Sequence, residues 1–518
     1  MQPHSETQSV LQTLLAELER LDIKLWVEGE RLRFEAPQGA LQPELRARLQ
    51  AHKKDLIDFL SQADSSFSAE TGDPVFRQDG ARVFPLSFSQ QHFGVLQTLH
   101  PNECYYNVPF GFRLDGRLDE AILHRSFEAI VERHDFLRTT LQQVDGTLMQ
   151  VVAPTGRIHL TMVDLQDLSV VEQDQAIRRE VHTECYTPFD LSRESALRVR
   201  LLKLAEDRHI LLFCLHNTLF EAGSLRALLN ELGQHYQAFL NGQPSSLPPL
   251  PMQYADGVRW QQSLLSTGLD ARLNYWREWF ARGEPPLITL AMAGVEVPPT
   301  GFRAAALWSE LSPELTKKIK ALSQQSGVTL FMTLLAAYAV VLHRCSGDRD
   351  IVMGTTSVNR NHWKLEPLIG SLLNVLALRF DLSGHPNFLT LFNQVRKVVL
   401  TAFAQQEVPF RVIAPLLQPG QQRTTPLFRT VFTFLGEMPK NQLQLAEIKV
   451  ELMEEVYGEV MFPDLYPAVW EKPTPAGTVL RICWQYKQDL FDEKTAAEQL
   501  QQFVAVLETM VHDPSQRI

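Results

Sequence analysis

A run of apolar residues that ends in polar side chains is the feature of this sequence most suited to chemistry. Residues 211–215 (Leu-Leu-Phe-Cys-Leu) predict a buried strand, and a helix is expected from about residue 225. The stretch between them carries four polar side chains, which are His216, Asn217, Glu221 and Ser224. Polar groups placed between a strand end and a helix N-terminus often build a site, because backbone N–H groups are free there.

Two interpretations of this stretch are open. In the first, His216 and Glu221 exchange protons as an acid–base pair, while Asn217 donates and accepts hydrogen bonds but takes up no proton at neutral pH. In the second, His216 is a hydrogen-bonded core histidine and Glu221 is a carboxylate at a helix start. The residues by themselves do not decide between them.

Composition excludes several classes of function. The 518 residues are 45% hydrophobic and carry 49 Lys and Arg against 60 Asp and Glu, a net charge of −11. This balance disfavours nucleic acid or an anionic membrane as the main partner. The five cysteines form no CxxC pair, which argues against a structural zinc and a disulfide framework. No signal peptide or membrane-spanning run precedes the first helix, so a cytoplasmic location is expected.

The elements that must position these side chains suggest an α/β protein in two parts. Residues 1–62 show a helical apolar period over 7–21, a hairpin pattern over 24–35 and a second helical period over 43–60. Residues 63–82 are polar and small, and read as a linker. Beyond them, strand-like and helical runs alternate, and Ser312-Pro313 predicts a helix start.

The larger part resembles the condensation-domain family of nonribosomal peptide synthetases. Residues 216–222 are similar to that family's active-site motif, His-His-x-x-x-Asp-Gly. Six other family motifs occur in the family's order, at Ser87–Gln91, Arg133–Thr139, Tyr254–Trp260, Ile369–Val375, Gln406–Phe410 and Arg423–Phe428. One match is weak evidence, but six in order across residues 83–518 make a specific resemblance.

The resemblance implies two chloramphenicol-acetyltransferase-like lobes in a V shape, at residues 83–265 and 266–518. Upstream and downstream carrier proteins would insert 4'-phosphopantetheine arms into a shared tunnel, where an acceptor amine attacks a donor thioester. No metal and no directly bound cofactor is implied. The chain ends where such domains usually end, so we expect it to be a piece of a longer synthetase.

The resemblance also implies roles for particular residues. Asn217 occupies the place of the family's second histidine, and Glu221 that of its aspartate, which pairs with an arginine matched here by Arg360. His216 corresponds to a histidine that is more often structural than catalytic. His216, Glu221 and Ser224 also align with the Asp-x-x-x-x-Asp-x-x-Ser motif of the heterocyclisation subgroup. Three residues are expected to line the tunnel, namely Trp363, Ser371 and Asn374.

The first sixty residues resemble the small N-terminal docking domain of the tubulysin and epothilone type. In that family a hairpin binds a C-terminal peptide of the upstream megasynthase subunit. Here Lys24, Arg31 and Arg33 would pair with acidic peptide residues, and Trp26 would anchor an apolar one. The alternative is a solvated hairpin face whose charges contribute nothing.

Three functions remain open at this stage. The first is an atypical condensation enzyme that forms an amide, with Asn217 orienting the amine. The second is another reaction on a carrier-bound substrate, such as heterocyclisation, dehydration or ester formation, with His216 and Glu221 as the acid–base pair. The third is a silent domain that binds carriers or recruits another enzyme. The sequence names neither the substrates nor the kind of upstream module.

Overall fold

The chain divides between residues 74 and 75 into two units, which are described separately. A computed structural model describes residues 24–28, 31–35, 43–51, 53 and 75–76, and most of 82–518. Within that last range it leaves out residues 100, 105, 157, 159, 246, 267–268, 282, 284–302, 361, 410–428, 438–442 and 454–462.

The first unit contains the predicted hairpin. Strands β1 (Lys24–Glu28) and β2 (Arg31–Glu35) pair antiparallel across two residues, as the alternating pattern predicts. Helix α2 (Pro43–Ala51) follows, with Leu45 and Leu49 buried. The helix predicted over residues 7–21 and most of the predicted extension of α2 to residue 60 lie outside the described residues.

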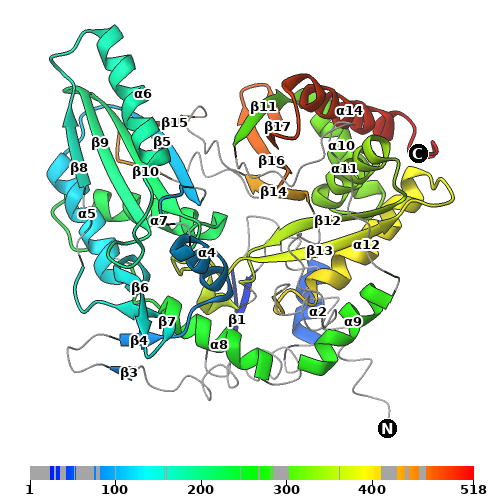
Figure 1. Cartoon of the computed structure of the whole chain (residues 1–518), viewed down its shortest axis with the longest axis horizontal. Helices are drawn as coiled ribbons and strands as arrows, with labels where there is room; N and C mark the ends of the chain where they lie inside the picture. Colours follow the sequence, from blue (N-terminus) through cyan, green and yellow to red (C-terminus); the bar gives the residue numbers. More distant parts are fainter. Residues whose placement is uncertain are drawn as a thin grey trace. The chain divides into compact units, whose positions relative to one another are not determined.

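A five-stranded sheet forms the centre of the N-terminal lobe of the second unit. Its central strand β10 pairs with β5 on one side and β9 on the other, which explains why Ile210–Leu215 is a continuous apolar run. Helix α6 packs on one face of this sheet, and α5 and α7 pack together on the other (Figure 1). In order, the sheet consists of β15 (Lys449–Leu452), β5 (Asn107–Asp115), β10 (Arg208–His216), β9 (Leu197–Ala205) and β8 (Leu160–Asp164), and its helices are α5 (Glu120–Arg133), α6 (Val170–Tyr186) and α7 (Ala222–Leu240).

A small antiparallel sheet and three helices complete this lobe. The predicted lobe boundary at 265/266 falls at the end of α8 and stays a prediction. In order, this sheet consists of β3 (Val75–Phe76), β4 (Arg82–Phe84), β7 (Thr147–Val152) and β6 (Thr139–Val144), and the helical elements are α4 (Phe88–Leu99), the 3-10 turn η1 (Asp135–Arg138), α8 (Tyr254–Ser266) and α9 (Leu269–Ala281).

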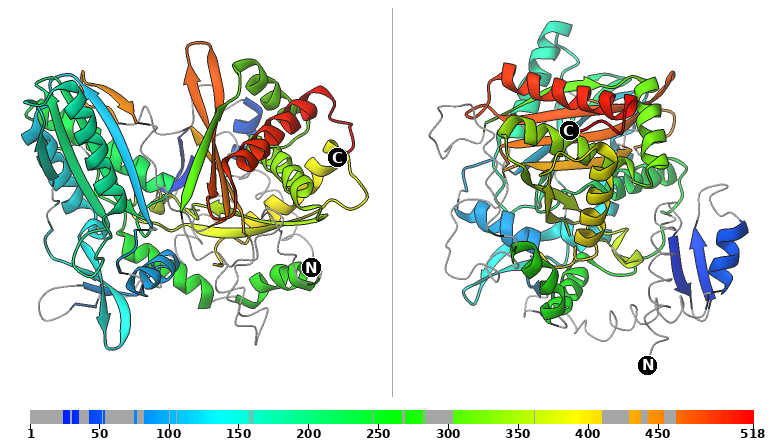
Figure 2. Two further views of the ribbon diagram at one scale, coloured as in Figure 1. Left: turned by 45° about the horizontal axis from the view of Figure 1, so that its top comes forward. Right: turned by 90° about the vertical axis from the view of Figure 1, so that its right-hand side faces the viewer.

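The C-terminal lobe is a six-stranded mixed sheet with helices packed on it (Figure 2). Helix α11 is buried from Met332 to Leu342, and α10 begins at the predicted Ser312 cap with Pro313 in its first turn. The strands in order are β11 (Ala304–Glu310), β17 (Gly477–Lys487), β16 (Leu465–Thr474), β14 (Val431–Glu437), β12 (Asp350–Ser357) and β13 (Asn374–Asp381), and the helical elements are α10 (Pro313–Gln325), α11 (Leu330–Ser346), the 3-10 turn η2 (Trp363–Leu365), α12 (Phe388–Phe403) and α14 (Glu493–His512).

One strand crosses from the C-terminal part of the chain into the N-terminal lobe. Strand β15 pairs antiparallel with β5, with Leu452 opposite Phe112. The segment before it lies against α7 at Gly233, where a Cβ atom would approach the Gln444 carbonyl oxygen to 2.6 Å. Glycine is therefore needed at this position, because only a residue without a Cβ lets the crossing backbone come this close.

Membrane-spanning length is not reached by any single helix among the described residues. Helices α10 and α11 pass a length and composition test only as a pair, and they are bent by 102° relative to each other.

Candidate functional site

The turn between β10 and α7 places the polar stretch at one end of the five-stranded sheet. His216 is the last residue of β10, and its carbonyl oxygen accepts from the N–H groups of Leu219 and Phe220, which closes a tight turn. The N–H of Asn217 donates to the carbonyl of Tyr106, so the turn is also tied to the start of β5. Glu221 is the N-cap residue of α7.

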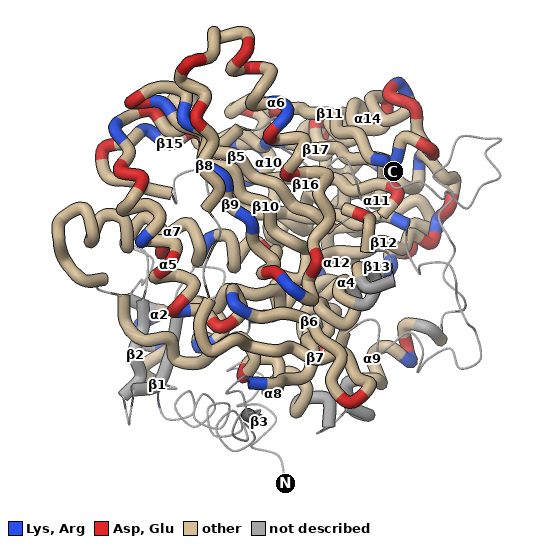
Figure 3. The backbone as a smooth tube through the Cα atoms, turned by 60° about the vertical axis from the view of Figure 1, so that its left-hand side comes forward, with Lys and Arg blue, Asp and Glu red and all other residues tan. Residues whose placement is uncertain are grey.

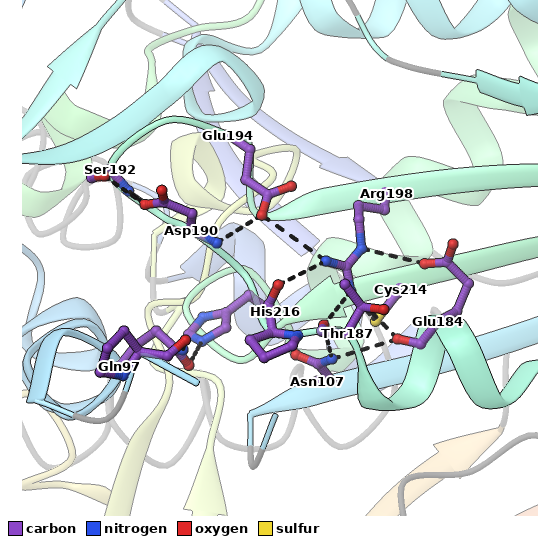
Figure 4. A network of polar contacts seen from close by, with 12 residues as sticks. Gln97, Asn107, Glu184, Thr187, Asp190, Ser192, Glu194, Arg198, Cys214 and His216 are labelled. Carbon is purple, nitrogen blue, oxygen red and sulfur yellow. Dashed lines mark hydrogen bonds and ion pairs between the residues drawn. The ribbon is translucent and has the colours of Figure 1, made fainter. Parts of the chain in front are cut away.

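His216 is enclosed completely, with no exposed surface (Figure 4). Its Nδ1 atom accepts from the N–H of Thr218 at 3.2 Å and lies 3.0 Å from the Thr218 hydroxyl. Its Nε2 atom faces Oε1 of Gln97 at 3.4 Å, and the Gln97 amide nitrogen donates to two backbone carbonyls. Because Oε1 can only accept, this network places the imidazole proton on Nε2.

Burial lowers the pKa of His216 to about 3, and the nearby Arg198 guanidinium adds to this effect. Arg198 is itself held by Glu184 at 3.3 Å and by the carbonyl of Thr187 at 2.7 Å. Around it, acidic and basic residues alternate between β9 and α6, as with Arg200 and Glu184 at 2.8 Å (Figure 3). His216 is therefore a neutral, fully hydrogen-bonded side chain at neutral pH.

Acidification is expected to destabilise the fold through His216. Its pKa is about 3 in the folded protein and ordinary, 6.5, in the unfolded chain, so the unfolded state binds the extra proton between these values. The stabilisation is complete above pH 6.5 and decreases below it, by about 2 kcal/mol at pH 5. Urea unfolding at pH 7 and pH 5 measures it, with His216→Gln as a non-titrating control. Equal pH dependence in both proteins would contradict the assignment.

Glu221, Ser224 and Arg360 form one buried cluster that joins the two lobes. Arg360 comes after β12, and its Nε makes an ion pair with Glu221, whose side chain has no exposed surface. Arg360 also donates to the Ser224 hydroxyl at 3.2 Å and to the Gly370 carbonyl at 2.9 Å. Glu221 further accepts from the N–H of Leu372 at 3.0 Å. The start of α7 is thereby fastened to the segment that precedes β13.

This cluster leaves little capacity for proton transfer. The Ser224 hydroxyl donates to the Gly370 carbonyl at 3.0 Å and accepts from the Gly370 N–H at 3.1 Å. Burial raises the pKa of Glu221, while the Arg360 charge and the Leu372 N–H oppose that rise. Every polar atom of Glu221 and Ser224 with a role in the cluster is directed at protein rather than at solvent.

Asn217 differs from its neighbours because it is only half-buried. Within the described part of the chain, its side-chain amide has no hydrogen-bond partner. Phe220, also half-buried, lies beside Phe110 of β5 with ring centroids 5.6 Å apart. The accessible surface of the turn thus combines one free amide with an aromatic pair.

The three residues expected to line a tunnel occupy different environments. Ser371 is buried, accepts from the Ser89 hydroxyl at 3.1 Å, and its carbonyl accepts from the Tyr254 hydroxyl at 2.6 Å. Asn374 is buried and donates to the carbonyls of Gln406 and Val408. Trp363 is 39% exposed. A lining role for these residues stays a prediction.

Gly370, in the same segment, meets a steric requirement. Its φ angle is +140°, and a Cβ atom there would approach the Tyr254 ring to 2.2 Å. Only glycine fits this backbone conformation beside the ring. The close contact holds the segment that carries Leu372 to α8.

The hairpin residues are placed by the register of β1 and β2. Lys24 pairs with Glu35, Trp26 with Arg33 and Glu28 with Arg31. Because residues opposite one another in an antiparallel pair share a face, positions 24, 26, 31 and 33 lie on one face of the hairpin.

Sequence reasoning missed several residues that hold the site. Gln97, Tyr106 and Arg198 surround His216, and they come from three elements distant in sequence. The available signal was weak, because only the alternation of β9 could have placed Arg198 on the same sheet face as His216. Within the described residues, no group of three His, Cys, Asp or Glu side chains could hold a metal ion.

Comparison with known proteins identifies the family. The condensation-domain model matches residues 81–518, and the model of the TubC N-terminal docking domain matches residues 11–62. The chain belongs to the condensation-domain family of nonribosomal peptide synthetases. It carries a docking domain of the TubC type at its N-terminus, so both predicted resemblances are confirmed.

Curated relatives are peptide synthetases. One of the proteins that make up linear gramicidin synthase of Brevibacillus parabrevis is 34% identical over 454 residues, covering 87% of this chain and 9% of the relative. Malpinin synthetase of Mortierella alpina is 33% identical over 472 residues, covering 91% of this chain and 6% of the relative. The chain spans less than a tenth of the length of these two relatives.

Solved structures confirm the predicted fold class. The X-domain from teicoplanin biosynthesis has a TM-score of 0.73 at 26% identity, covering 84% of this chain and 96% of that one. The first condensation domain of the calcium-dependent antibiotic synthetase has a TM-score of 0.70 at 18% identity, covering 84% and 98%, and supports the fold alone.

Proposed function

We propose that the condensation domain of this chain forms an amide bond between two carrier-bound substrates. The acceptor amine attacks the carbonyl carbon of the donor thioester, so that a C–N bond forms and the C–S bond breaks. The proton lost by the amine reaches the departing thiolate through solvent. Both substrates arrive on 4'-phosphopantetheine arms of upstream and downstream carrier proteins, and no further cofactor is required.

The free amide of Asn217 is the observation that carries this proposal. It occupies the place of the family's second histidine and is half-buried without a partner in the described chain. Its Oδ1 atom can accept from the amine and orient the nitrogen lone pair, and its N–H groups can donate to the oxygen on which negative charge develops. Asn217 is therefore assigned an orienting role.

An amine suits a site without a free base. Its neutral form already carries a nucleophilic lone pair, and holding it against a thioester supplies most of the rate through proximity. A hydroxyl acceptor would need a base, and His216 and Glu221 are enclosed and hydrogen-bonded within the protein. This burial weighs against heterocyclisation, dehydration or ester formation, which all require proton transfer.

Intact-mass spectrometry of both carriers tests the proposal. We expect the acceptor carrier to gain the donor's acyl group and the donor arm to return to a free thiol. An acceptor whose amine is acetylated serves as control and should gain nothing. A product that has also lost one water would instead indicate heterocyclisation or dehydration, and the absence of any transfer would contradict catalysis.

We further propose that the hairpin face with Lys24, Trp26, Arg31 and Arg33 receives an acidic C-terminal peptide of the upstream subunit. The match to the TubC docking model and the common face given by the β1–β2 register support this. Basic residues on one face attract an acidic peptide, and the adjacent indole can anchor an apolar residue.

Charge reversal at Arg31 and Arg33 is expected to weaken peptide binding about tenfold at low salt, with a smaller effect at high salt. Calorimetry of the full chain with a synthetic peptide rich in Glu and Leu measures it. Lys53→Glu, an equal charge change at an exposed position outside the hairpin, is the control. A matching loss in the Lys53 variant would assign the effect to net charge and refute the hairpin site.

A second candidate function is recruitment of another enzyme without catalysis. It is favoured by the likeness to the teicoplanin X-domain, which has also been solved in complex with OxyB at a TM-score of 0.73 and 26% identity, covering 86% of this chain and 96% of that one. Under this alternative, loaded carriers bind but no acyl group moves, and Asn217 variants behave like the wild type. The mass assay distinguishes the two functions.

A further inference from the structure

A cavity of about 380 Å³ lies in the N-terminal lobe, outside the candidate site. Helices α5 and α7, which lie beside each other in Figure 1, and the proline-rich segment 244–251 enclose it. Its position along α7, near His235, is about 20 Å from the Glu221 end at 1.5 Å per residue. The cavity therefore takes no part in the contacts around Glu221 and Arg360.

His235 is an unpartnered polar side chain in the wall of this cavity. It is 3% exposed, and neither ring nitrogen has a hydrogen-bond partner among the described residues. Burial lowers its pKa, with Arg133 and His134 adding to the effect and Glu231 opposing it. A neutral imidazole offers one N–H donor and one bare acceptor nitrogen. Two such atoms left unpaired are costly, so a ligand that pairs them recovers free energy.

Arg133 provides a second set of donors at the same wall. Its Nε is engaged by Glu231 at 3.1 Å, and Glu231 also binds His134 at 2.8 Å. Neither Nη atom of Arg133 has a partner in the described chain. Because Glu231 neutralises the guanidinium charge and Glu132 is exposed nearby, the site favours a carbonyl oxygen over an anion.

The remaining walls favour an apolar body. Ala129 of α5 faces Leu247, Pro249 and Leu250 of the proline-rich segment. Gln253 is already occupied, because its amide nitrogen donates to the Arg133 carbonyl and its oxygen accepts from a backbone N–H, both at 3.0 Å. Polar recognition is thus left to His235 and Arg133.

We propose that this cavity binds a small uncharged amide of about dipeptide size. Its carbonyl oxygen accepts from Arg133, its N–H donates to the bare nitrogen of His235, and its apolar substituents pack on Ala129, Leu247 and Leu250. The volume lies at the lower end of the range typical of small-molecule sites. The proposal is independent of the proposed condensation activity.

Calorimetric titration of the full chain with N-acetyl-L-leucine N-methylamide tests this site. We expect binding with a Kd of about 1 mM, and at least about tenfold weaker binding of N-acetyl-L-leucine, which carries a carboxylate. His235→Leu should weaken binding of the amide about tenfold, because the two ring atoms are lost.

Ala129→Leu is the second variant, since leucine is a good helix former and fills the cavity without touching the polar residues. It should also abolish binding, and it decides the matter if His235→Leu does not fold. Equal heats in wild type and Ala129→Leu, preference for the carboxylate, or no binding up to about 10 mM would each overturn the proposal. The last result would assign the cavity to water alone.

Discussion

Replacing Arg360 by alanine is expected to lower the free energy of unfolding by about 3–5 kcal/mol. The substitution leaves the Glu221 carboxylate buried without its counter-charge, and removing one partner of a buried pair costs this much. It also removes the donors to the Ser224 hydroxyl and the Gly370 carbonyl. The connection between α7 and the segment before β13 is therefore expected to loosen.

Urea unfolding of the full chain measures this effect. Arg226→Ala, which removes the same side chain from an exposed position of α7, should change the unfolding free energy by less than about 0.5 kcal/mol. Arg360→Lys should recover only part of the loss, because an ammonium group cannot reproduce the planar guanidinium contacts. A loss below about 1 kcal/mol for Arg360→Ala would mean that the cluster does not hold the lobes together.

Replacing Asn217 by alanine is expected to lower the single-turnover rate of amide formation about tenfold to a hundredfold. The estimate corresponds to one lost hydrogen bond to a group that becomes charged in the transition state. Stability should remain unchanged, because the side chain is half-buried and makes no hydrogen bond in the described chain.

Rapid quenching followed by mass analysis of both carriers gives this rate. Asn217→Asp serves as the matched control, since it keeps the shape and one oxygen but removes the N–H donors. A wild-type rate in Asn217→Ala would refute the orienting role and favour the recruitment alternative.

Local signals account for most of what the sequence predicted correctly. The Ile210–Leu215 run forms β10 because a central strand is apolar on both faces, and Ser312-Pro313 starts α10 because cap and first-turn preferences act within a few residues. The β1–β2 hairpin follows from alternation across two turn residues. Each of these elements is encoded where it forms.

Long-range contacts were beyond the reach of the sequence. Strand β15 has only four residues, and nothing in them specifies pairing with β5, which lies more than three hundred residues earlier. Enclosure of His216 depends on Gln97 and Arg198, which reach it through tertiary packing alone. The family resemblance could propose Glu221 and Arg360 as partners, but only coordinates give the backbone groups that complete their cluster.

The pH dependence of the single-turnover rate tests most directly that no side chain of this chain takes the amine's proton. The wild-type rate should follow the ionisation of the acceptor amine alone, with no further inflection between about pH 5 and 8, since the pKa of His216 is about 3. Asn217→His should add an inflection near the ordinary histidine pKa, about 6.5. An inflection in the wild type that is absent from the amine's own titration would contradict the account.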